Sequence, residues 1–144
     1  MANDRDAIAA LVFRYAELLD RGDLAGVANL FADATLRSNR HDVVRRGRDQ
    51  AFALYRDTVI LYDGVPCTQH VITNLVVDLG GDTASARCQF SVLQARPELP
   101  LQVILAGRYH DRFARADGRW RFDDRLILVD LVGKLRWHAR RPLG

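Results

Sequence analysis

The chain has 144 residues, of which 49% are hydrophobic and 27% charged, and its formal net charge is +3. This composition is ordinary for a globular protein and excludes a disordered or low-complexity chain. A chain of this length buries roughly two-thirds of the surface of its unfolded form. We therefore expect a single domain over residues 1–144, with its core at about 6–131 and a C-terminal tail at 132–144.

The positive charge comes from arginine, because Lys134 is the only lysine in the chain. Arginines are spread along the sequence and become dense only in "RHDVVRRGR" and "RWHARR". Neither patch carries interleaved aromatic residues at a repeat that would stack bases, and no nucleic-acid-binding motif is present. The charge pattern therefore favours solvated arginine side chains over a nucleic-acid partner.

The cysteines and the N-terminus bear on the compartment. Cys67 and Cys88 lie in no CxxC motif and in no cluster with metal-ligand spacing, which favours a reducing environment. The first twenty residues have acidic side chains in their first turn and no uninterrupted apolar segment, unlike a signal peptide or a membrane span. We expect a cytoplasmic protein that has no membrane partner.

Three helices are predicted before residue 63. Apolar residues recur at spacings of three and four near the N-terminus, which is the pattern of a helix with one buried stripe. The members of this stripe are Ile8, Leu11, Val12, Tyr15, Leu18 and Leu19. Gly22 in "DRGD" ends this helix, and a short second helix is expected over 24–31. A third helix is predicted from about Asp49 to Tyr62, with Tyr55 on its apolar stripe.

Strand patterns dominate the rest of the chain. "FADATLRS" is expected to turn into a short first strand, and "NRHDVVRRGRDQ" is expected to be a polar loop. Four longer β-rich runs follow, at 65–79, 83–94, 101–113 and 119–131, separated by "GGD", "RPELP" and "ADG". Short turns between long strands indicate antiparallel pairing. Helices first and strands later place the chain in the α+β class, with a curved sheet, helices on one face and a pocket between them.

The order and spacing of several segments resemble one known family. "IAALVFRYAELLDRGDLAGVANLFADAT", "GRDQAFALY", "TQHVITNLVVDLGGDTASARC" and "GRYHDRFARADGRWRF" together are similar to the SnoaL-like proteins of the nuclear transport factor 2-like superfamily. The resemblance implies a cone-shaped α+β barrel, in which a curved, mainly antiparallel sheet wraps around three N-terminal helices and leaves a deep pocket. Members act on or bind small, mostly apolar molecules without a metal or an organic cofactor, and they are usually dimers or trimers.

Within that superfamily the closest chemical pattern is that of scytalone dehydratase. Its catalytic aspartate corresponds to Asp20 in "LLDRGDL", and its first catalytic histidine corresponds to His70 in "TQHVITN". The position of its second catalytic histidine falls near Gln89, and its pocket serine and asparagine fall near Gly107 and Tyr109. The resemblance therefore implies that the aspartate and one histidine are kept in surroundings that differ from those of scytalone dehydratase.

The predicted pair can carry a proton transfer. Histidine titrates near neutral pH and exchanges a proton with a substrate atom that lies within hydrogen-bond reach. A carboxylate on its other ring nitrogen fixes the tautomer and raises the basicity, so we expect His70 to be the catalytic acid and base and Asp20 to orient it. A structural interpretation stays open for both residues: Asp20 can bond only the turn after its helix, and backbone groups can satisfy His70.

Five further residues are candidates for binding a substrate oxygen. If strand residues alternate strictly between the two faces, Asn74 shares a face with the histidine and lines the pocket. Gln89 and Tyr109 are placed in the pocket by the family positions. Tyr15 and Tyr55 lie on the apolar stripes of two helices, where their hydroxyls either reach the cavity or are satisfied at the rim of the core. Hydrogen-bond donors of these kinds suit a carbonyl or an enolate oxygen.

Other chemistries lack their motifs. The sequence has no GxSxG elbow, no HExxH motif and no glycine-rich phosphate loop. His41, His110 and His138 are scattered without ligand spacing, so we expect neither a metal nor an organic cofactor. Trp137 and His138 lie in the tail, which either folds over a pocket mouth, meets a neighbouring subunit or is frayed.

Two functions are compatible with these residues. The first is a cofactor-independent lyase (dehydratase) or isomerase that acts on a small cyclic or aromatic ketone-like metabolite by His/Asp general acid–base catalysis. The alternative is a non-catalytic protein that uses the same pocket to bind a small apolar or aromatic molecule or to assemble with a partner. In both cases the outer face of a curved sheet favours a homodimer or a homotrimer.

Overall fold

The computed structural model describes residues 3–141 and contains three helices, the third of which follows two short strands. They are α1 (Asp4–Asp20), α2 (Leu24–Leu30) and α3 (Gly47–Thr58). The side chain of Asn3 accepts a hydrogen bond from Asp6 N and caps α1, and the side chain of Asp23 accepts one from Gly26 N and caps α2. The two N-terminal helices therefore lie where the apolar stripes predicted them.

The third helix is shorter than predicted, because the sequence analysis placed its end at Tyr62. Thr58 is its last residue, and Val59 already has an extended backbone with φ −89° and ψ 131°. Val59 forms an isolated antiparallel bridge with Ala139 near the C-terminus, and Tyr62 forms one with Val65. The apolar stripe of α3 thus continues as an extended segment, whose backbone groups bond to the tail rather than to a further helical turn.

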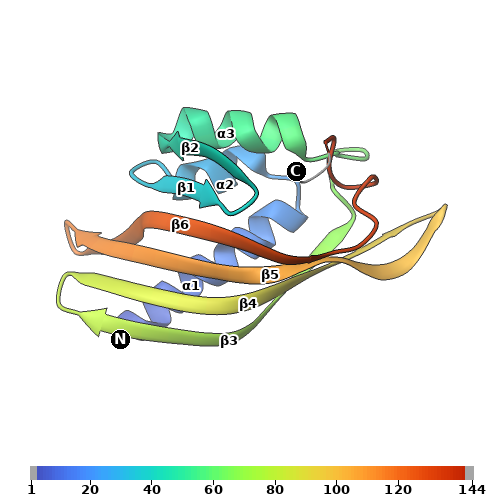
Figure 1. The fold of residues 1–144 in the computed structure, drawn as a ribbon. Helices are drawn as coiled ribbons and strands as arrows, with labels where there is room; N and C mark the ends of the chain where they lie inside the picture. Colours follow the sequence, from blue (N-terminus) through green and yellow to red (C-terminus); the bar gives the residue numbers. More distant parts are fainter. Residues whose placement is uncertain (1–2, 142–144) are drawn as a thin grey trace.

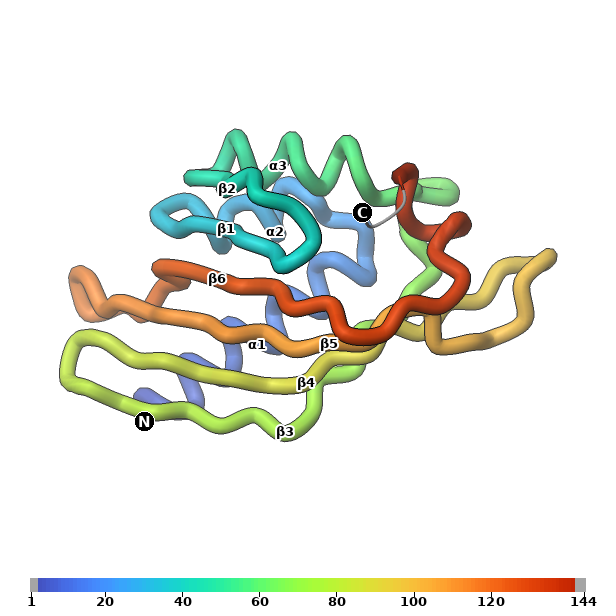
Figure 2. The backbone as a smooth tube through the Cα atoms, in the orientation of Figure 1, coloured from blue at the N-terminus to red at the C-terminus, as the bar shows by residue number. Residues whose placement is uncertain are grey.

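Six strands form one curved, mixed sheet, shown in Figures 1 and 2. They are β1 (Thr35–Ser38), β2 (His41–Arg46), β3 (Thr68–Gly80), β4 (Thr83–Arg96), β5 (Leu99–Ala116) and β6 (Arg119–Val132). The order across the sheet is β2-β1-β6-β5-β4-β3, with β1 and β6 parallel and all other neighbours antiparallel. α1 crosses behind the long strands, and α3 lies beside β1 and β2 (Figure 1). The predicted α+β fold is confirmed.

Two expectations about the sheet are wrong. The segment predicted to be a polar loop contains β2, whose side chains are nearly all exposed. A polar, charged sequence suits an edge strand, because one side of such a strand faces water. β2 and β3 are the outer strands of the sheet in the part of the chain that the structure describes. The sheet is therefore open, so the cone-shaped barrel that the resemblance implied is not closed in the described residues.

The tail folds back onto the segment that follows α3. Ile60 N donates a 2.8 Å hydrogen bond to His138 O, and Arg140 N donates a 2.9 Å hydrogen bond to Thr58 O. In Figure 2 this part of the chain, in red, lies beside the end of α3. Of the alternatives for the tail, the described residues fit the one in which it folds over the pocket.

The core lies between the helices and the inner face of the sheet, and it contains an ion pair. Arg125 donates from Nε and Nη2 to the carboxylate of Asp111 at 2.7 and 2.9 Å, and the two side chains are 0% and 1% exposed. The guanidinium Cζ lies 4.3 Å from the ring centroid of Tyr15 and 3.8 Å from that of Tyr109. Two aromatic rings thus cover the buried charge and are held in place by it.

Candidate functional site

A cavity of about 470 Å³ lies between α1, α3, the inner face of the sheet and the tail. Its size is within the range of sites for small molecules. Its apolar lining includes Leu19, Leu36, Leu54, Phe90, Leu105, Ile127 and Leu135. Four residues that the sequence predicted for the site line it: Tyr15, Tyr55, His70 and Tyr109. The cavity therefore suits a small and mainly apolar molecule that carries a polar group.

The structure brings the predicted aspartate and histidine together. Asp20 Oδ1 lies 2.6 Å from His70 Nδ1, and Asp20 Oδ2 accepts a 2.7 Å hydrogen bond from the backbone N of His70. Thr68 Oγ1 donates a further hydrogen bond of 2.8 Å to Asp20 Oδ1. The carboxylate thus holds the ring and the backbone of His70 at the start of β3, and the His70 side chain is only 4% exposed.

A glycine explains how the end of α1 reaches the start of β3. Gly22, in the turn after α1, has φ +77°, a conformation that residues with a side chain rarely adopt. A Cβ atom on Gly22 would lie 1.9 Å from the carbonyl oxygen of Gly64, in the loop before β3. Only glycine permits this close approach, which sets Asp20 beside His70.

The charge state of the pair follows from its hydrogen bonds. Burial raises the pKa of the Asp20 carboxyl, but the hydrogen bonds and charge of His70 and the hydroxyl of Thr68 outweigh it and hold this pKa below the ordinary 3.8. A carboxylate only accepts hydrogen bonds, so His70 Nδ1 carries the ring proton. The other nitrogen, Nε2, is then left to accept a proton from a molecule in the cavity.

Three tyrosines supply neutral hydroxyl groups to the cavity. The hydroxyl oxygens of Tyr15 and Tyr55 are hydrogen-bonded at 2.7 Å, and the ring of Tyr109 stacks on Phe90 with centroids 4.3 Å apart. Burial raises the pKa of all three phenols above the ordinary 10.0, although the charge of Arg125 opposes the rise. The three hydroxyls are therefore protonated at neutral pH and can act as hydrogen-bond donors.

Asn74 does not lie in the cavity, so its predicted placement is wrong. β3 pairs regularly with β4 up to Thr73, and a bulge then shifts the register before Val76. Asn74 lies in this bulge with φ +55°, and its exposed side chain donates a 2.8 Å hydrogen bond to Gln89 Oε1. A bulge adds a residue to one strand and interrupts the alternation of faces on which the prediction relied.

The predicted placement of Gln89 is wrong for a different reason. Along β4 the neighbours Cys88 and Phe90 are buried, and Gln89 between them is exposed. Cys88 is the cross-strand partner of Tyr109, and partners directly opposite each other point to the same side of a sheet. An inward Tyr109 therefore requires an outward Gln89, and the position that the resemblance assigned to a second histidine faces away from the cavity.

Two further histidines, His41 and His138, line the cavity, although the sequence assigned neither of them to it. His138 of the tail is 8% exposed and lines the cavity together with His70. Burial, and then the charge of His70, lower the pKa of His138 from 6.5 to about 4, against an opposing effect of Asp20. No local pattern reveals this contact, because it depends on the tail pairing with a segment far away in the sequence.

The described residues give no sign of a metal site or a membrane span. Between residues 3 and 141 no group of three or more histidine, cysteine, aspartate or glutamate side chains is arranged to hold a metal ion. In the same range no helix is both long enough and apolar enough to cross a membrane.

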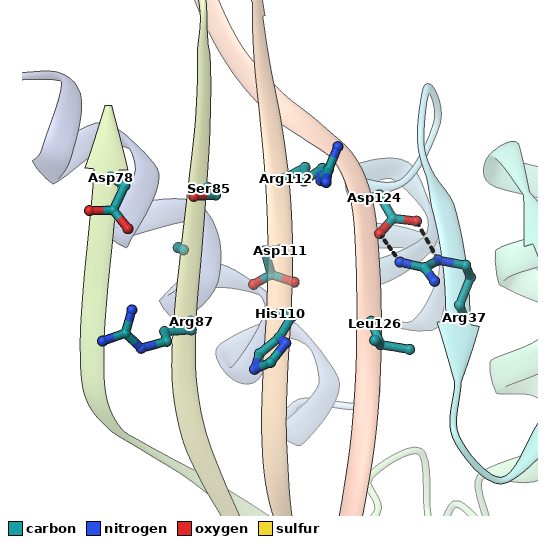
Figure 3. Close-up of a pocket in the computed structure, with 10 residues that line it drawn as sticks. Arg37, Asp78, Ser85, Arg87, His110, Asp111, Arg112, Asp124 and Leu126 are labelled. Carbon is teal, nitrogen blue, oxygen red and sulfur yellow. Dashed lines mark hydrogen bonds and ion pairs between the residues drawn. The ribbon is translucent and has the colours of Figure 1, made fainter. Parts of the chain in front are cut away.

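A second depression, of about 330 Å³, lies on the outer face of the sheet (Figure 3). Its side chains are mostly polar and include Arg37, Asp78, Ser85, Arg87, His110, Arg112 and Asp124. In Figure 3 the side chains on the long strands stand in front of the sheet, with α1 behind, so they point away from the cavity, and only Arg37 of this set also lines the cavity. Arg37 binds Asp124 through Nε at 2.9 Å and Nη2 at 2.7 Å, so opposite charges neutralise each other here.

Comparisons with known proteins agree with this fold. The family model described as the SnoaL-like domain matches residues 1–125. No curated protein sequence matches the chain. An NTF2-like protein with a cystatin-like fold from Novosphingobium aromaticivorans has a TM-score of 0.74 and 24% identity, with 88% of this chain and 81% of that chain covered.

Two further structures from Novosphingobium aromaticivorans are similar. One is named "Putative Scytalone Dehydratase" and has a TM-score of 0.71 and 24% identity, with 89% of this chain and 85% of that chain covered. The other is named as the beta subunit of a "putative aromatic-ring-hydroxylating dioxygenase" and has a TM-score of 0.69 and 22% identity, with 88% of each chain covered. At these identities the likeness establishes the fold alone.

Proposed function

Since the chain belongs to the family of SnoaL-like domains, we propose that its cavity binds a small cyclic or aromatic ketone-like molecule and moves a proton on it. The reaction is that of a cofactor-independent lyase (dehydratase) or isomerase. The observation that supports this proposal is the 2.6 Å contact between Asp20 and His70 at the wall of an apolar cavity. The similar structure that is named "Putative Scytalone Dehydratase" supports the dehydratase in particular.

Proton transfer begins at His70. Nε2 takes a proton from the carbon next to the ligand carbonyl, and the electrons of that C–H bond form a C=C bond while the carbonyl oxygen becomes an enolate. Asp20 keeps Nδ1 protonated and balances the charge of the imidazolium. Tyr15 and Tyr55 share one hydrogen bond, so one of their two hydroxyls and the hydroxyl of Tyr109 are the donors available to the enolate oxygen.

The imidazolium of His70 then returns its proton. In an isomerase the proton goes to a different carbon of the ligand. In a dehydratase it goes to a hydroxyl on the second carbon from the carbonyl. The enolate electrons re-form the carbonyl and a C=C bond, the C–O bond breaks, and water leaves. The ligand loses one water molecule, and His70 returns to its neutral form.

Deuterium exchange tests the step that both reactions share. We expect the protein to exchange the C2 hydrogens of 1-tetralone in D₂O, and His70→Gln to slow this exchange by about 10²–10⁴-fold, since the general base is lost. Asp20→Asn slows it too, because the tautomer is no longer fixed. Exchange is followed by proton NMR, with His110→Gln on the outer face as the control that keeps the wild-type rate.

One outcome would refute the catalytic proposal: a His70→Gln variant that folds normally and exchanges 1-tetralone at the wild-type rate. A second probe distinguishes the two reactions. 3-Hydroxy-1-tetralone that loses water tautomerises to 1-naphthol, whose fluorescence reports a dehydratase, whereas an isomerase exchanges the C2 hydrogens without releasing this product.

A non-catalytic binding or assembly function is the second candidate. It is favoured by the similar structure that is named as a beta subunit, and by exposed apolar residues near one end of β5 and β6. Leu101, Val103, Leu131 and Val132 are 48% to 70% exposed. Apolar residues gathered in this way suit self-association into the homodimer or homotrimer, or a partner subunit. Light scattering on the wild type and on Leu131→Glu measures the oligomer. This candidate would be selected if Asp20→Asn and His70→Gln bind 1-naphthol as the wild type does and if the wild type itself shows no deuterium exchange.

A further inference from the structure

The backbone of the tail fixes His138 at the cavity. His138 N donates a 2.8 Å hydrogen bond to Leu135 O, and His138 O accepts the one from Ile60 N. On its C-terminal side, Ala139 pairs with Val59 and Arg140 N bonds to Thr58 O. Because backbone hydrogen bonds hold the chain on both sides of His138, the position of its imidazole at the cavity is fixed.

The ring of His138 has an unsatisfied nitrogen. Nδ1 is buried and has no hydrogen-bond partner among residues 3–141. In a neutral imidazole one nitrogen carries the proton and the other accepts. With no acceptor near Nδ1, the proton is better placed on Nε2, since a buried N–H without a partner is destabilising. Nε2–H is then the group through which His138 can donate to a molecule in the cavity.

Burial is the main reason that His138 stays neutral. The electrostatic effect of His70 from β3 also lowers the pKa of His138, and the opposing effect of Asp20 from α1 is smaller. The other ionisable residues that line the cavity are Tyr15, Tyr55, Tyr109, Arg37, Arg40, His41, Arg45 and Arg141. The three phenols are protonated and carry no charge, so burial and His70 account for the neutral state of His138.

We propose that His138, supplied by the C-terminal tail, is the second functional histidine of the cavity, and that it donates a hydrogen bond from its neutral imidazole to the oxygen of the bound ligand. This inference rests on the proposed function and adds a residue to it. His70 is the group that moves the proton, and His138 is a donor for the carbonyl oxygen on which charge develops. The enolate gains a hydrogen bond that strengthens as its charge grows.

This arrangement gives the site two histidines with different roles. A neutral imidazole donor needs no proton from solvent, and it does not compete with His70 for the proton that is being moved. The position near Gln89, where the resemblance placed a second histidine, is on the other face of the sheet. The imidazole of His138 therefore enters the cavity from the C-terminal tail and not from a strand of the sheet.

Paired ligands test the inference without requiring turnover. 1-Naphthol carries the oxygen that His138 is proposed to bind, and naphthalene lacks it. We expect His138→Phe to weaken 1-naphthol binding about fivefold to tenfold, the value of one hydrogen bond, and to leave naphthalene binding unchanged. His138→Gln keeps an N–H donor and retains part of the preference. Arg140→Gln, exposed in the same tail, is the matched control and binds both ligands as the wild type does.

Histidine side-chain ¹⁵N NMR gives a second readout. We expect 1-naphthol to shift the ring resonances of His138, and His70→Gln to raise the pKa of His138, because the electrostatic effect of His70 that lowers this pKa is removed. His138→Phe and His138→Gln variants that keep the full preference for 1-naphthol, with His138 resonances unmoved by the ligand, would overturn the inference. If the protein prefers 1-naphthol to naphthalene through His138 but exchanges no hydrogen of 1-tetralone, the catalytic proposal is refuted and the contact between His138 and the ligand oxygen stands. If exchange depends on His70 and no substitution of His138 changes ligand binding, the catalytic proposal stands and the inference about His138 is refuted.

Discussion

The two faces of the sheet carry histidines in opposite circumstances. His70 on β3 faces the cavity, where its side chain is 4% exposed and bound to a carboxylate. His110 on β5 is exposed in the polar depression of the outer face (Figure 3). The same sheet supplies both residues, so residue type alone does not mark a site. What differs is the exclusion of water and a fixed hydrogen-bond partner, which are the features expected of a histidine that transfers protons.

Ion pairs show the same contrast. Arg125 and Asp111 are 0% and 1% exposed on the inner face, whereas Arg108 and Asp130 are 42% and 39% exposed. Both pairs have two N–H donors on one carboxylate. If one residue of the outer pair is removed, water can replace it beside the remaining charge, whereas water does not reach the inner pair. Similar geometry therefore predicts very different consequences when one partner is removed.

Removal of the inner carboxylate is expected to have the largest effect on stability. Asp111→Asn leaves the guanidinium of Arg125 buried without a counter-charge, which costs about 3–5 kcal/mol of unfolding free energy. The matched change on the outer face, Asp130→Asn, costs at most about 1 kcal/mol. Urea denaturation of both variants measures the difference. Equal losses in the two variants would show that the two faces do not differ in this way.

The second prediction concerns pH and compares His138 with His110. The pKa of His138 is about 4 in the folded protein, against 6.5 for an unperturbed histidine side chain. Between these values the unfolded chain binds a proton at His138 that the folded chain does not, so stability falls as the pH falls through this window. The loss that His138 adds by pH 4 is about 3 kcal/mol.

Carboxylates also titrate in this pH range, so the contribution of His138 to the stability is measured by comparing the wild type with a variant that lacks this imidazole. Urea denaturation at pH 7 and pH 4 should show a shallower decline for His138→Gln than for the wild type. His110→Gln, changed on the outer face, should follow the wild-type curve. Identical pH dependence in the wild type and in His138→Gln would mean that the imidazole is not buried in its neutral form.

Local patterns predicted most of the fold, and contacts between distant segments account for what they missed. The stripe from Ile8 to Leu19 and the capping residues Asn3 and Asp23 act within one or two helical turns, so the sequence reveals α1 and α2. The pairing of Asp20 with His70 was expected only through the family resemblance. For His138 the sequence left open whether the tail folds over the pocket mouth, because its position depends on backbone bonds to Thr58 and Ile60.

The bulge in β3 is the clearest case of a missed local feature. "ITNLVV" has the pattern of a regular strand, and asparagine tolerates both extended and left-handed backbone conformations. Nothing in the stretch shows that Asn74 adopts the second conformation, which shifts the residues after it by one place relative to β4. A strict alternation of faces was therefore correct for His70 and wrong four residues later.

The smallest predicted effect sharpens the contrast between the faces at this bulge. Asn74→Ala places a residue with a Cβ and no local hydrogen bonds at φ +55°, which costs about 1 kcal/mol of unfolding free energy. Asn74→Gly is expected to cost less, because glycine adopts positive φ without strain. Neither change should alter the affinity for 1-naphthol, since the Asn74 side chain bonds Gln89 on the outer face and does not line the cavity. Fluorescence titration measures the affinity for 1-naphthol. A lower affinity in Asn74→Ala, but not in Gln89→Ala, would show that Asn74 takes part in ligand binding after all.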